Sequence, residues 1–361
     1  MKISTERFKE AVNNSIKGAS NNNLLPLTSM VGIKNNGKAL KLVTTDGTNT
    51  LVVTIENVAS ENSIDITVPA DVFGKLVSKI TSSEVELKVE NDTLIVKANG
   101  TYKIPLVVDE EGSVSFPVPS YNGENVENTK LSYLMSVYNT NKSALATTFE
   151  NPFLTGYYAD DMVVTSDANV ITFNEIDLGI GKVLLNAQMI SLITLAKTED
   201  VFVVIDDNTV VLGTPELEVI GKALDGIEDY PIDAMKEYLG ESFPSSCKVA
   251  KQSLLSALGR LALFIEPYDK NGAYFSFGRR GLTLSSKKSS STESISYVES
   301  KDFQQFICCV DIPQMKTQLE AYPEDLVEIH YGLENALKLT SGKITQVISL
   351  LEDEDLENKS E

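Results

Sequence analysis

One pattern occurs three times in this 361-residue chain. A stretch with the spacing of an amphipathic helix is followed by a strand, a short polar turn and a second strand. The copies begin at Val68, Leu184 and Val310, at intervals of roughly 110 to 130 residues, a length that can bury its own core. We therefore predict three similar domains in tandem, at residues 1–120, 128–243 and 246–351, followed by an acidic tail at 352–361.

The first copy shows the two periodicities most clearly. VPADVFGKLVSKI places Val72, Phe73 and Val77 on one stripe of a helix and its lysines on the other side. EVELKVENDTLIVKA alternates apolar and charged residues before Asn91-Asp92, and Leu94, Val96 and Ala98 resume the period of two after it, the pattern of a half-buried antiparallel hairpin. A further amphipathic stretch opens each domain. This order predicts the α+β class, with two helices per domain packed on antiparallel sheets.

The composition is typical of a soluble intracellular protein. Hydrophobic residues make up 42% of the chain, without an apolar run long enough for a membrane span and without the pattern of a signal peptide. Cys247, Cys308 and Cys309 are an odd number with two adjacent members, which suits reduced thiols in a core better than a disulfide framework. We predict a cytoplasmic protein that does not bind membranes.

Catalytic chemistry has little support in the sequence. His330 is the only histidine, which argues against histidine metal clusters and against Ser-His or Cys-His catalysis. The acidic pairs Asp160-Asp161 and Asp206-Asp207 fall at predicted strand turns, and Asp353 to Asp355 fall in the tail. The chain has no GxxxxGK[ST] or GxGxxG motif. We predict no catalytic site, no metal and no cofactor.

Linkers are predicted where the composition changes. Residues 107–129 and 226–246 are rich in Pro, Gly and polar residues and lie between the copies of the repeat. The stretch SSKKSSSTES, from Ser285 to Ser294, reads as a hairpin loop. The last ten residues, EDEDLENKSE, read as a solvated acidic tail.

Several segments of the first domain resemble one known family. They are TVPADVFGKLVSKI with the following EVELKVENDTLIVKANGTYKIPL, the earlier Leu25-Pro26-Leu27, and LVTTDGTN, with weaker counterparts in the later domains. With them the chain resembles the bacterial sliding clamp, the beta subunit of DNA polymerase III. The resemblance covers the whole chain, is most specific in the first domain and rests on the apolar pattern in the other two. Its divergence suits a bacteriophage-encoded member.

The resemblance implies an architecture and a function. Two three-domain chains would close head to tail into a homodimeric ring, with the sheets outside and the polar faces of the helices lining the hole. Duplex DNA would pass through the hole, bound topologically and without sequence specificity. The ring would tether the replicative DNA polymerase for processive synthesis, and polymerase and clamp loader would bind it through short peptide motifs.

The net charge of −20 is informative for such a function. A protein that holds DNA by neutralising phosphates needs an excess of Lys and Arg, and this chain has the opposite. A topological tether has no such need, and an acidic exterior would keep DNA off the outer surface. An acidic surface that only keeps the protein soluble is the simpler interpretation of the total charge. The placement of the basic residues is therefore the better test.

The polar faces of the predicted helices carry the candidates for DNA contact. They are Lys9, Lys17, Lys75, Lys79, Lys197, Lys251, Arg260 and Lys316. Each alone is an ordinary solvated residue, but together they predict a basic inner wall. Just ahead of its Leu-Pro the family often carries a basic residue, whereas this chain has Asn22 and Asn23, which does not support a DNA contact from that loop.

The resemblance also implies a peptide cleft between the second and third domains. By position its wall would include Thr165 and Val170, in the family's Thr-Asp-Gly-His-Arg-Leu stretch, and Ile348, Ser349 and Leu350, in its terminal apolar-Pro-apolar segment. Residues 166–169 depart from the family pattern, which implies a peptide preference of its own. Three of the five, Val170, Ile348 and Leu350, would suit a structural core equally well. The acidic tail would either screen this cleft or lie in solvent.

Two other interpretations stay open. One is a structural protein of three β-rich domains, such as a virion component, in which the helices only brace the sheets and no DNA is enclosed. The other is a monomeric processivity factor. Chain stoichiometry separates them, because a closed ring of such chains needs two copies joined by heterologous contacts.

Overall fold

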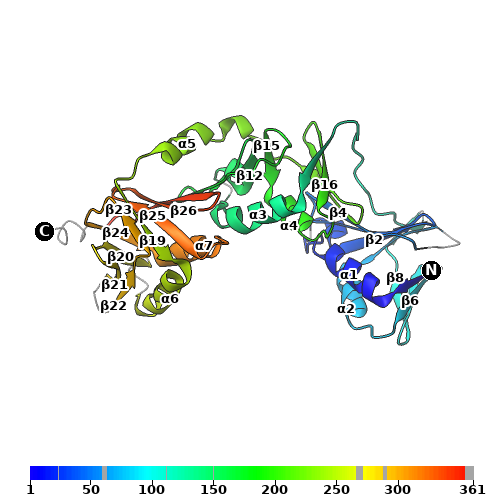
Figure 1. Cartoon of the computed structure of the whole chain (residues 1–361). Coiled ribbons are helices and arrows are strands. Elements are labelled where there is room, and N and C mark those ends of the chain that lie inside the picture. The colour runs from blue at the N-terminus through cyan, green and yellow to red at the C-terminus, as the bar shows by residue number, and fades with distance from the viewer. Residues whose placement is uncertain are drawn as a thin grey trace. The chain divides into compact units, whose positions relative to one another are not determined.

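The computed structural model describes residues 1–22, 24–58, 63–110, 112–148, 150–265, 271–287 and 291–353. By its backbone contacts the chain divides into two compact units. The first contains residues 1–135 and 185–224, and the second contains residues 136–184 and 225–361. Both units combine helices with antiparallel sheets, as the predicted α+β class requires (Figure 1).

The first copy of the repeat folds in the order strand, helix, four strands, helix and three strands. Its elements are β1 (Lys2–Ser4), α1 (Thr5–Ile16), β2 (Met30–Asn35), β3 (Leu40–Thr45), β4 (Thr50–Ile55), β5 (Ile64–Pro69), α2 (Ala70–Ser78), β6 (Glu84–Glu90), β7 (Thr93–Lys97) and β8 (Thr101–Pro105). The predicted β6–β7 hairpin turns at Asn91, whose positive φ of 50° is a conformation that Asn tolerates. Val72, predicted on the apolar stripe of α2, is instead exposed, because the buried face runs through Phe73 and Val77.

The second copy repeats this order. Its elements are β11 (Val126–Lys130), α3 (Leu131–Asn141), β12 (Gly156–Ala159), β13 (Val163–Ser166), β14 (Val170–Asn174), β15 (Val183–Asn186), α4 (Ala187–Ile193), β16 (Asp200–Asp206), β17 (Thr209–Gly213) and β18 (Leu217–Lys222). The helical stretch predicted from Leu184 begins as the end of β15. The Asn186 side chain accepts a hydrogen bond from the Gln188 N–H at 2.8 Å and caps the short helix there.

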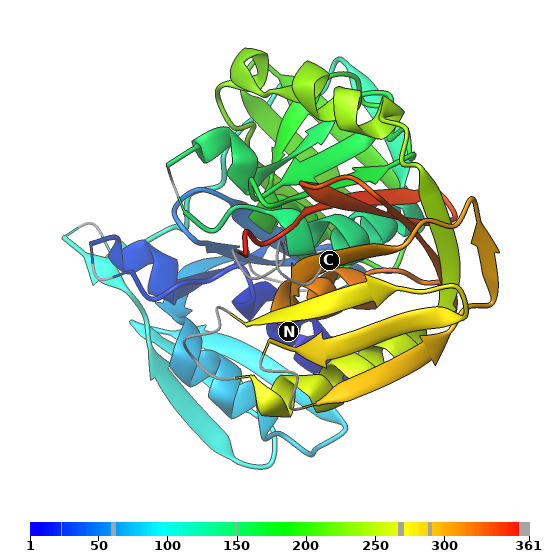
Figure 2. The same cartoon turned by 90° about the vertical axis from the view of Figure 1, so that its left-hand side faces the viewer.

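The third copy has the same order again. Its elements are β19 (Ser245–Ala250), α6 (Lys251–Leu261), β20 (Gly272–Phe277), β21 (Gly281–Ser286), β22 (Thr292–Ser296), β24 (Phe306–Asp311), α7 (Ile312–Glu320), β25 (Leu326–Tyr331), β26 (Ala336–Ser341) and β27 (Ile344–Ser349), with a short β23 (Glu299–Lys301) inserted. Strands β20 to β22, yellow to light orange, lie next to one another in Figure 2. The predicted loop Ser285–Ser294 contains the end of β21 and the start of β22, and residues 288–290 lie outside the described ranges.

The segments between the copies are more ordered than predicted. Residues 107–129 include the two-residue strands β9 (Val108–Asp109) and β10 (Gly112–Ser113) and the buried ring of Phe116. Residues 226–246 contain a helix, α5 (Ile232–Gly240), which the sequence analysis missed. The Lys338 ammonium donates to the carbonyls of Leu239 and Glu241 at the end of this helix, at 3.3 and 2.9 Å. A proline before a helix and a glycine at its end were signals available in the sequence.

Strand pairing between copies merges their sheets. In the first unit β18 pairs antiparallel with β4, which gives the eight-stranded order β11-β16-β17-β18-β4-β3-β2-β5. In the second unit β27 pairs with β14, which gives β15-β12-β13-β14-β27-β26-β25-β19-β23. Strands β18 and β27 are the last strands of their copies, and β4 and β14 are each the third strand between the two helices. The two joints are therefore equivalent. The counterparts β8 and β22 are edge strands of the sheets β1-β6-β7-β8 and β22-β21-β20-β24.

A buried polar network lies beside the β14–β27 joint. The Asn141 side-chain amide donates to the Thr165 hydroxyl and to the Thr172 carbonyl, at 3.3 and 3.2 Å. The Gln346 amide of β27 donates to the Thr172 hydroxyl at 3.3 Å and to the Gln318 side chain of α7 at 2.8 Å. All five residues are buried. Since unpaired polar groups are costly in a core, this network favours one arrangement of helix and strands.

Removal of the Asn141 side chain should therefore destabilise the second unit. We expect Asn141→Ala to lower the free energy of unfolding by about 2–4 kcal/mol, because its partners stay buried without a donor. Asn139→Ala is the matched control, since Asn139 is exposed on the same helix. Urea-induced unfolding followed by circular dichroism measures both variants. Equal stability of the two would show that the network contributes little.

Candidate nucleic-acid interface and partner groove

Helices α1 and α2 pack against each other through their apolar faces. The rings of Phe8 and Phe73 meet edge to face, with 5.9 Å between their centroids. Gly74 permits the close approach, because a Cβ at that position would lie 2.0 Å from Ile16 Cδ1. Of the predicted residues, Lys9 lies on α1 and Lys75 on α2, while Lys17 and Lys79 are the C-cap residues that directly follow the two helices.

Helices α6 and α7 form the corresponding pair in the second unit. Leu258 of α6 and Leu319 of α7 belong to one apolar core. Pro313 lies in the first turn of α7, where its missing N–H costs no hydrogen bond, and the Asp311 side chain caps the helix by accepting from the Gln314 N–H at 2.8 Å. Arg260 lies exposed at the end of α6 and Lys316 lies partly exposed on α7.

The eight predicted DNA contacts fall into two groups. Four side chains already have a partner: Lys75 with Asp71, Lys197 with Glu10, Arg260 with Glu293, and Lys251 with the Tyr322 carbonyl. Within the described part of the chain, the other four make no side-chain hydrogen bond or ion pair; they are Lys9, Lys17, Lys79 and Lys316. An exposed ion pair such as Lys75–Asp71 contributes little and can be exchanged for a phosphate. Lys251 is less available, because its ammonium is 2.5 Å from a backbone oxygen.

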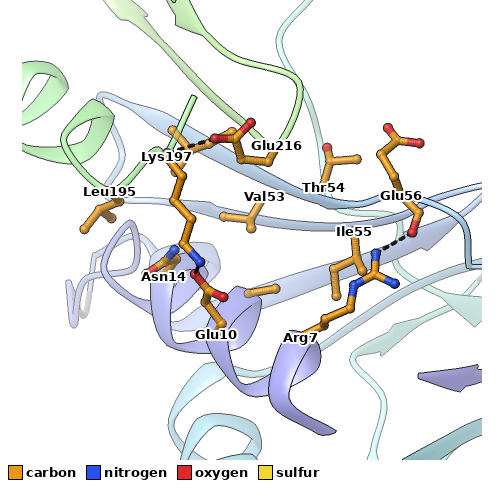
Figure 3. A pocket seen from close by; sticks show the side chains of 12 residues that line it. Arg7, Glu10, Asn14, Val53, Thr54, Ile55, Glu56, Leu195, Lys197 and Glu216 are labelled. Atoms are coloured by element: carbon orange, nitrogen blue, oxygen red, sulfur yellow. Dashed lines mark hydrogen bonds and ion pairs between the residues drawn. The ribbon is translucent and has the colours of Figure 1, made fainter. Parts of the chain in front are cut away.

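A hollow in the first unit brings Lys197 to helix α1. Figure 3 shows Lys197 reaching from the segment after α4 to Glu10, its ion-pair partner. The Lys197 and Thr198 N–H groups donate to the Glu216 carboxylate at 2.8 and 2.9 Å. Burial is the largest single effect and raises the pKa of Glu216, but the hydrogen bonds together outweigh it and lower that pKa to about 2. The ionised carboxylate therefore fixes the backbone from which Lys197 extends.

The second unit contains a groove of about 500 Å³ beside the last strand. Helix α7 contributes Pro313 and Gln318 to its lining, and the segment that ends β27 contributes Ser349, Leu350 and Leu351. Most of the remaining lining is polar. Its size and its mixture of apolar and polar groups suit a short extended peptide with apolar anchors.

Only two of the five predicted cleft residues line this groove. Ser349 and Leu350 line it. Thr165, Val170 and Ile348 are not among its lining residues, and their place in a peptide cleft stays a prediction. Val170 and Ile348 are buried cross-strand partners at the β14–β27 joint, and the buried Thr165 hydroxyl donates to the Asn141 carbonyl at 2.9 Å. All of β13 and most of β14 and β27 are buried, so these side chains lie in the core.

Residues that the sequence analysis did not single out also belong to these surfaces. Arg7 lies on α1 at the hollow of Figure 3, where its guanidinium donates to the Glu56 carbonyl at 2.7 Å. Gln318 lines the groove although it reads as a polar residue on a helix. After α6, in the 3-10 turn η5 (Ala262–Phe264), Leu263 and Phe264 are 80% and 54% exposed. Two adjacent apolar residues beyond a helical stripe were the only signal for this patch.

The loop ahead of Leu25 exposes a large apolar side chain. Leu24 is 88% exposed, and its N–H donates to the Asn22 side-chain oxygen at 3.0 Å. Asn22 is therefore engaged in the local turn, and Asn23 lies outside the described residues.

Reactive groups are few in the described ranges. The three cysteines are buried and free, and burial raises the pKa of the Cys247 thiol to about 12. Burial also lowers the pKa of His330. In the same ranges, His, Cys, Asp and Glu side chains do not gather in groups of three or more suited to a metal ion. None of the helices described is long and apolar enough to span a membrane.

The acidic sequences lie partly as predicted. Asp160-Asp161 and Asp206-Asp207 are at the turns β12–β13 and β16–β17. Asp353 was predicted in a solvated tail, but its side chain is only 6% exposed, because it pairs with Lys287. Glu354, Asp355 and the rest of the tail lie outside the described residues.

The repeated fold with its helix pairs is the fold of the DNA sliding clamps. The chain is similar to the beta subunit of DNA polymerase from Streptococcus pyogenes, with 18% identity over 98% of this chain and 99% of that chain and a TM-score of 0.85. It is similar to the Bacillus subtilis sliding clamp, with 15% identity over 98% of both chains and a TM-score of 0.84. A Pseudomonas aeruginosa sliding clamp bound to griselimycin has 16% identity over 98% and 99% and a TM-score of 0.86.

The match to a family model lies in the first domain. Residues 1–114 match the model of the DNA polymerase III beta subunit, N-terminal domain. The resemblance that the segments of this domain predicted is therefore confirmed, and the fold predicted for the later domains is confirmed by the solved clamps. No curated protein sequence matches the chain. The three domain boundaries and a bacteriophage origin stay predictions.

Proposed function

We propose that this protein is a DNA sliding clamp, two copies of which close into a ring around duplex DNA and hold the replicative polymerase on its template. The observation that carries the proposal is a sliding-clamp fold over 98% of the chain, with residues 1–114 matching the beta-subunit N-terminal domain. The ring acts by enclosure in the cytoplasm, with no catalytic site, metal or cofactor of its own. Nothing in the fold favours the alternative of a structural virion protein.

The repeated strand joint supports closure by two chains. Within the chain, the last strand of one copy pairs with the third strand between the two helices of another, as β18 with β4 and β27 with β14. The same rule would pair β8 of one chain with β22 of a second chain. Both strands are sheet edges with unused backbone groups, and edges of this kind are suited to strand addition. Two such contacts, related by a twofold axis, would close a head-to-tail dimer.

An exposed apolar pair lies close to one of these edges. Arg260 of α6 forms a bidentate pair with Glu293 of β22, at 2.7 and 2.6 Å, so the end of α6 lies beside the edge strand. Leu263 and Phe264 follow directly in η5. Large apolar side chains exposed beside an open sheet edge are typical of an interface. We infer that a partner chain covers them.

The charges are consistent with sliding on enclosed DNA. With a net charge of −20, the protein is expected to bind phosphates weakly overall, while unpaired lysines on the helices supply local attraction. Lys9, Lys17, Lys79 and Lys316 are the side chains we propose as DNA contacts, with Lys75, Lys197 and Arg260 available after exchange of their ion pairs. We assign Lys251 a structural role.

The groove beside β27 is the proposed docking site for peptides of the polymerase and clamp loader. Leu350 and Leu351 supply apolar surface, and Ser349 and Gln318 supply polar groups for backbone and side-chain hydrogen bonds. Extended peptides with a few apolar anchors suit such a groove.

Enclosure predicts a dependence on DNA topology. Protein that a clamp loader has placed on nicked circular duplex DNA should remain bound through gel filtration at high salt. It should leave when a restriction enzyme cuts the circle, because a ring slides off free ends. Protein held by phosphate contacts would instead be lost with salt and would be indifferent to the cut.

A variant that cannot close provides the control for enclosure. Leu263→Asp with Phe264→Asp should convert dimers to monomers in sedimentation velocity and abolish retention on circles, since burial of two such side chains contributes about 3 kcal/mol or more. Leu24→Asp, also at an exposed leucine, should leave the dimer intact. A double variant that still dimerises would exclude this interface. Wild-type protein that stays bound to linear DNA would exclude enclosure.

The unpaired lysines should account for the attraction between ring and DNA. Replacement of Lys9, Lys17, Lys79 and Lys316 by Ala should weaken binding of a fluorescent duplex in anisotropy titrations. It should also reduce the slope of log affinity against log salt by roughly one for each phosphate that is no longer neutralised. The matched variant replaces four exposed lysines on strands and turns, Lys38, Lys41, Lys222 and Lys343. Equal weakening in the two variants would contradict the assignment.

Leu350 should be needed for peptide binding. A nine-residue peptide selected on the wild-type protein from a random display library serves as the probe. Leu350→Asp should weaken its binding about tenfold or more, because the groove no longer offers that apolar anchor. Leu326→Asp, at an exposed leucine that begins β25, is the control and should bind normally. Unchanged binding by the Leu350 variant, with fold and dimer intact, would remove Leu350 from the site.

A further inference from the structure

The chain after β27 connects two sheets. The Leu350 N–H donates to the Asn335 carbonyl, next to β26, at 2.9 Å. The following N–H, of Leu351, donates at 2.9 Å to the Cys309 carbonyl of β24, an edge strand of the sheet β22-β21-β20-β24. The same two leucines line the groove. One wall of the groove is therefore a short bridge with one backbone hydrogen bond at each of its two leucines.

Asp353 fastens the far end of this bridge. Its carboxylate lies 3.0 Å from the Lys287 ammonium and accepts a hydrogen bond from the Tyr274 hydroxyl at 3.0 Å. The ion pair is well shielded, with the two side chains 20% and 6% exposed. Tyr274 belongs to β20 and Lys287 follows β21, so both partners come from the sheet whose edge Leu351 joins. Neighbouring Glu352, by contrast, is exposed.

The side chains under the bridge are closely packed around Gly272. A Cβ at this position would lie 2.7 Å from Lys287 Cε, 2.9 Å from Cys309 Sγ and 3.2 Å from Leu351 Cδ1. Burial is the largest effect on the pKa of the Cys309 thiol and raises it; the charge of Lys287 lowers this pKa and that of Asp353 raises it, with a net value of about 11. Cys309 is therefore a buried, protonated thiol next to the bridge.

We propose that Asp353 is a positioning residue that holds Leu350 and Leu351 in place as a wall of the partner groove. Removal of one member of a shielded, hydrogen-bonded ion pair leaves the other without compensation. In the described part of the chain, the bridge is otherwise held by its two backbone hydrogen bonds and by the packing of Leu350 against the apolar core, so loss of the ion pair should let it open more often. Without the anchor the two leucines leave their positions more often. The consequence for peptide binding rests on the proposed function of the groove, whereas the anchoring itself does not.

Thiol chemistry tests the anchor without any ligand. In Asp353→Ala the reaction of Cys309 with 5,5′-dithiobis(2-nitrobenzoic acid) should be about tenfold faster than in the wild type, because the cover opens more often and the thiol pKa falls. Cys247 and Cys308 are internal controls, since both are buried and should keep their rates. Mass spectrometry of peptic fragments assigns the modified cysteine. Glu352→Ala is the matched variant and should react as the wild type does.

Hydrogen exchange and peptide binding complete the test. In Asp353→Ala the Leu351 amide should exchange about tenfold faster, which corresponds to a free energy of opening lower by about 1.4 kcal/mol. The peptide selected on the wild-type protein should bind about three- to tenfold more weakly. Asp353→Asn, which keeps a hydrogen-bond acceptor for Tyr274 without the charge, should give a smaller change of the same sign.

The outcomes separate the anchor from the groove. Wild-type reactivity of Cys309 and wild-type exchange of Leu351 in Asp353→Ala would overturn the anchor. Faster reaction and exchange with unchanged peptide affinity would overturn its role in positioning the groove. If Leu350→Asp did not weaken binding of the selected peptide, the proposed groove would be refuted instead. The thiol and exchange rates would still decide whether Asp353 holds the bridge.

Discussion

Backbone pairing between the ends of the repeated copies is the interaction on which the rest of the structure depends. At β18–β4 and at β14–β27, strands from different copies share one ladder, so the middle copy contributes half its strands to each large sheet. This sharing explains why the two compact units do not coincide with three repeats. Because exposed edge groups need partners, the same pairing leaves β8 and β22 suited to a second chain. Closure of a ring by two chains, as proposed, would extend this internal strand pairing to the assembly.

The second of these joints is also where the partner groove is built. Gln318 joins the buried network through Gln346 and lines the groove on its other side, so the position of α7 and the shape of the groove have a common cause. The groove is also lined by the bridge from β27 to β24. Leu350 of this bridge packs against the apolar core, and the ion pair of Asp353 with Lys287 is its proposed anchor. A site with one rigid side and one tethered side can accept peptides of different sequence.

The electrostatics fit a protein that encloses DNA and does not grip it. Half of the predicted contact residues are already engaged within the chain, and only four lysines on helices α1, α2 and α7 and their ends make no side-chain hydrogen bond or ion pair in the described ranges. A few contacts give weak, salt-sensitive attraction, whereas a net charge of −20 disfavours tight binding at other surfaces. In the proposed ring the holding force would come from topology, at no cost in mobility along the DNA.

The sequence by itself determined what depends on local pattern. The three copies, the α+β class, the hairpins with turn residues such as Asn91 and the polar faces carrying Lys9 and Lys79 all follow from side-chain periodicity, which a short stretch of chain contains. Resemblance in the first domain then pointed to the clamp fold. The α+β class and the clamp fold were confirmed, because neither prediction requires knowledge of which distant segments meet.

Tertiary structure alone decided which backbones pair and which side chains are covered. Strands such as β18 and β4 are joined by main-chain hydrogen bonds, and every residue except proline can form both kinds of bond. The pairing could therefore not be read from the sequence. Burial followed from that choice: Val170 and Ile348 face each other inside the joint, while Ser349 and Leu350, one step further, line the groove. Asp353 reads as part of an acidic tail, and only the neighbouring sheet, with Lys287 and Tyr274, makes it an anchor. Long-range contacts set the environment of a residue, and that environment decides its role.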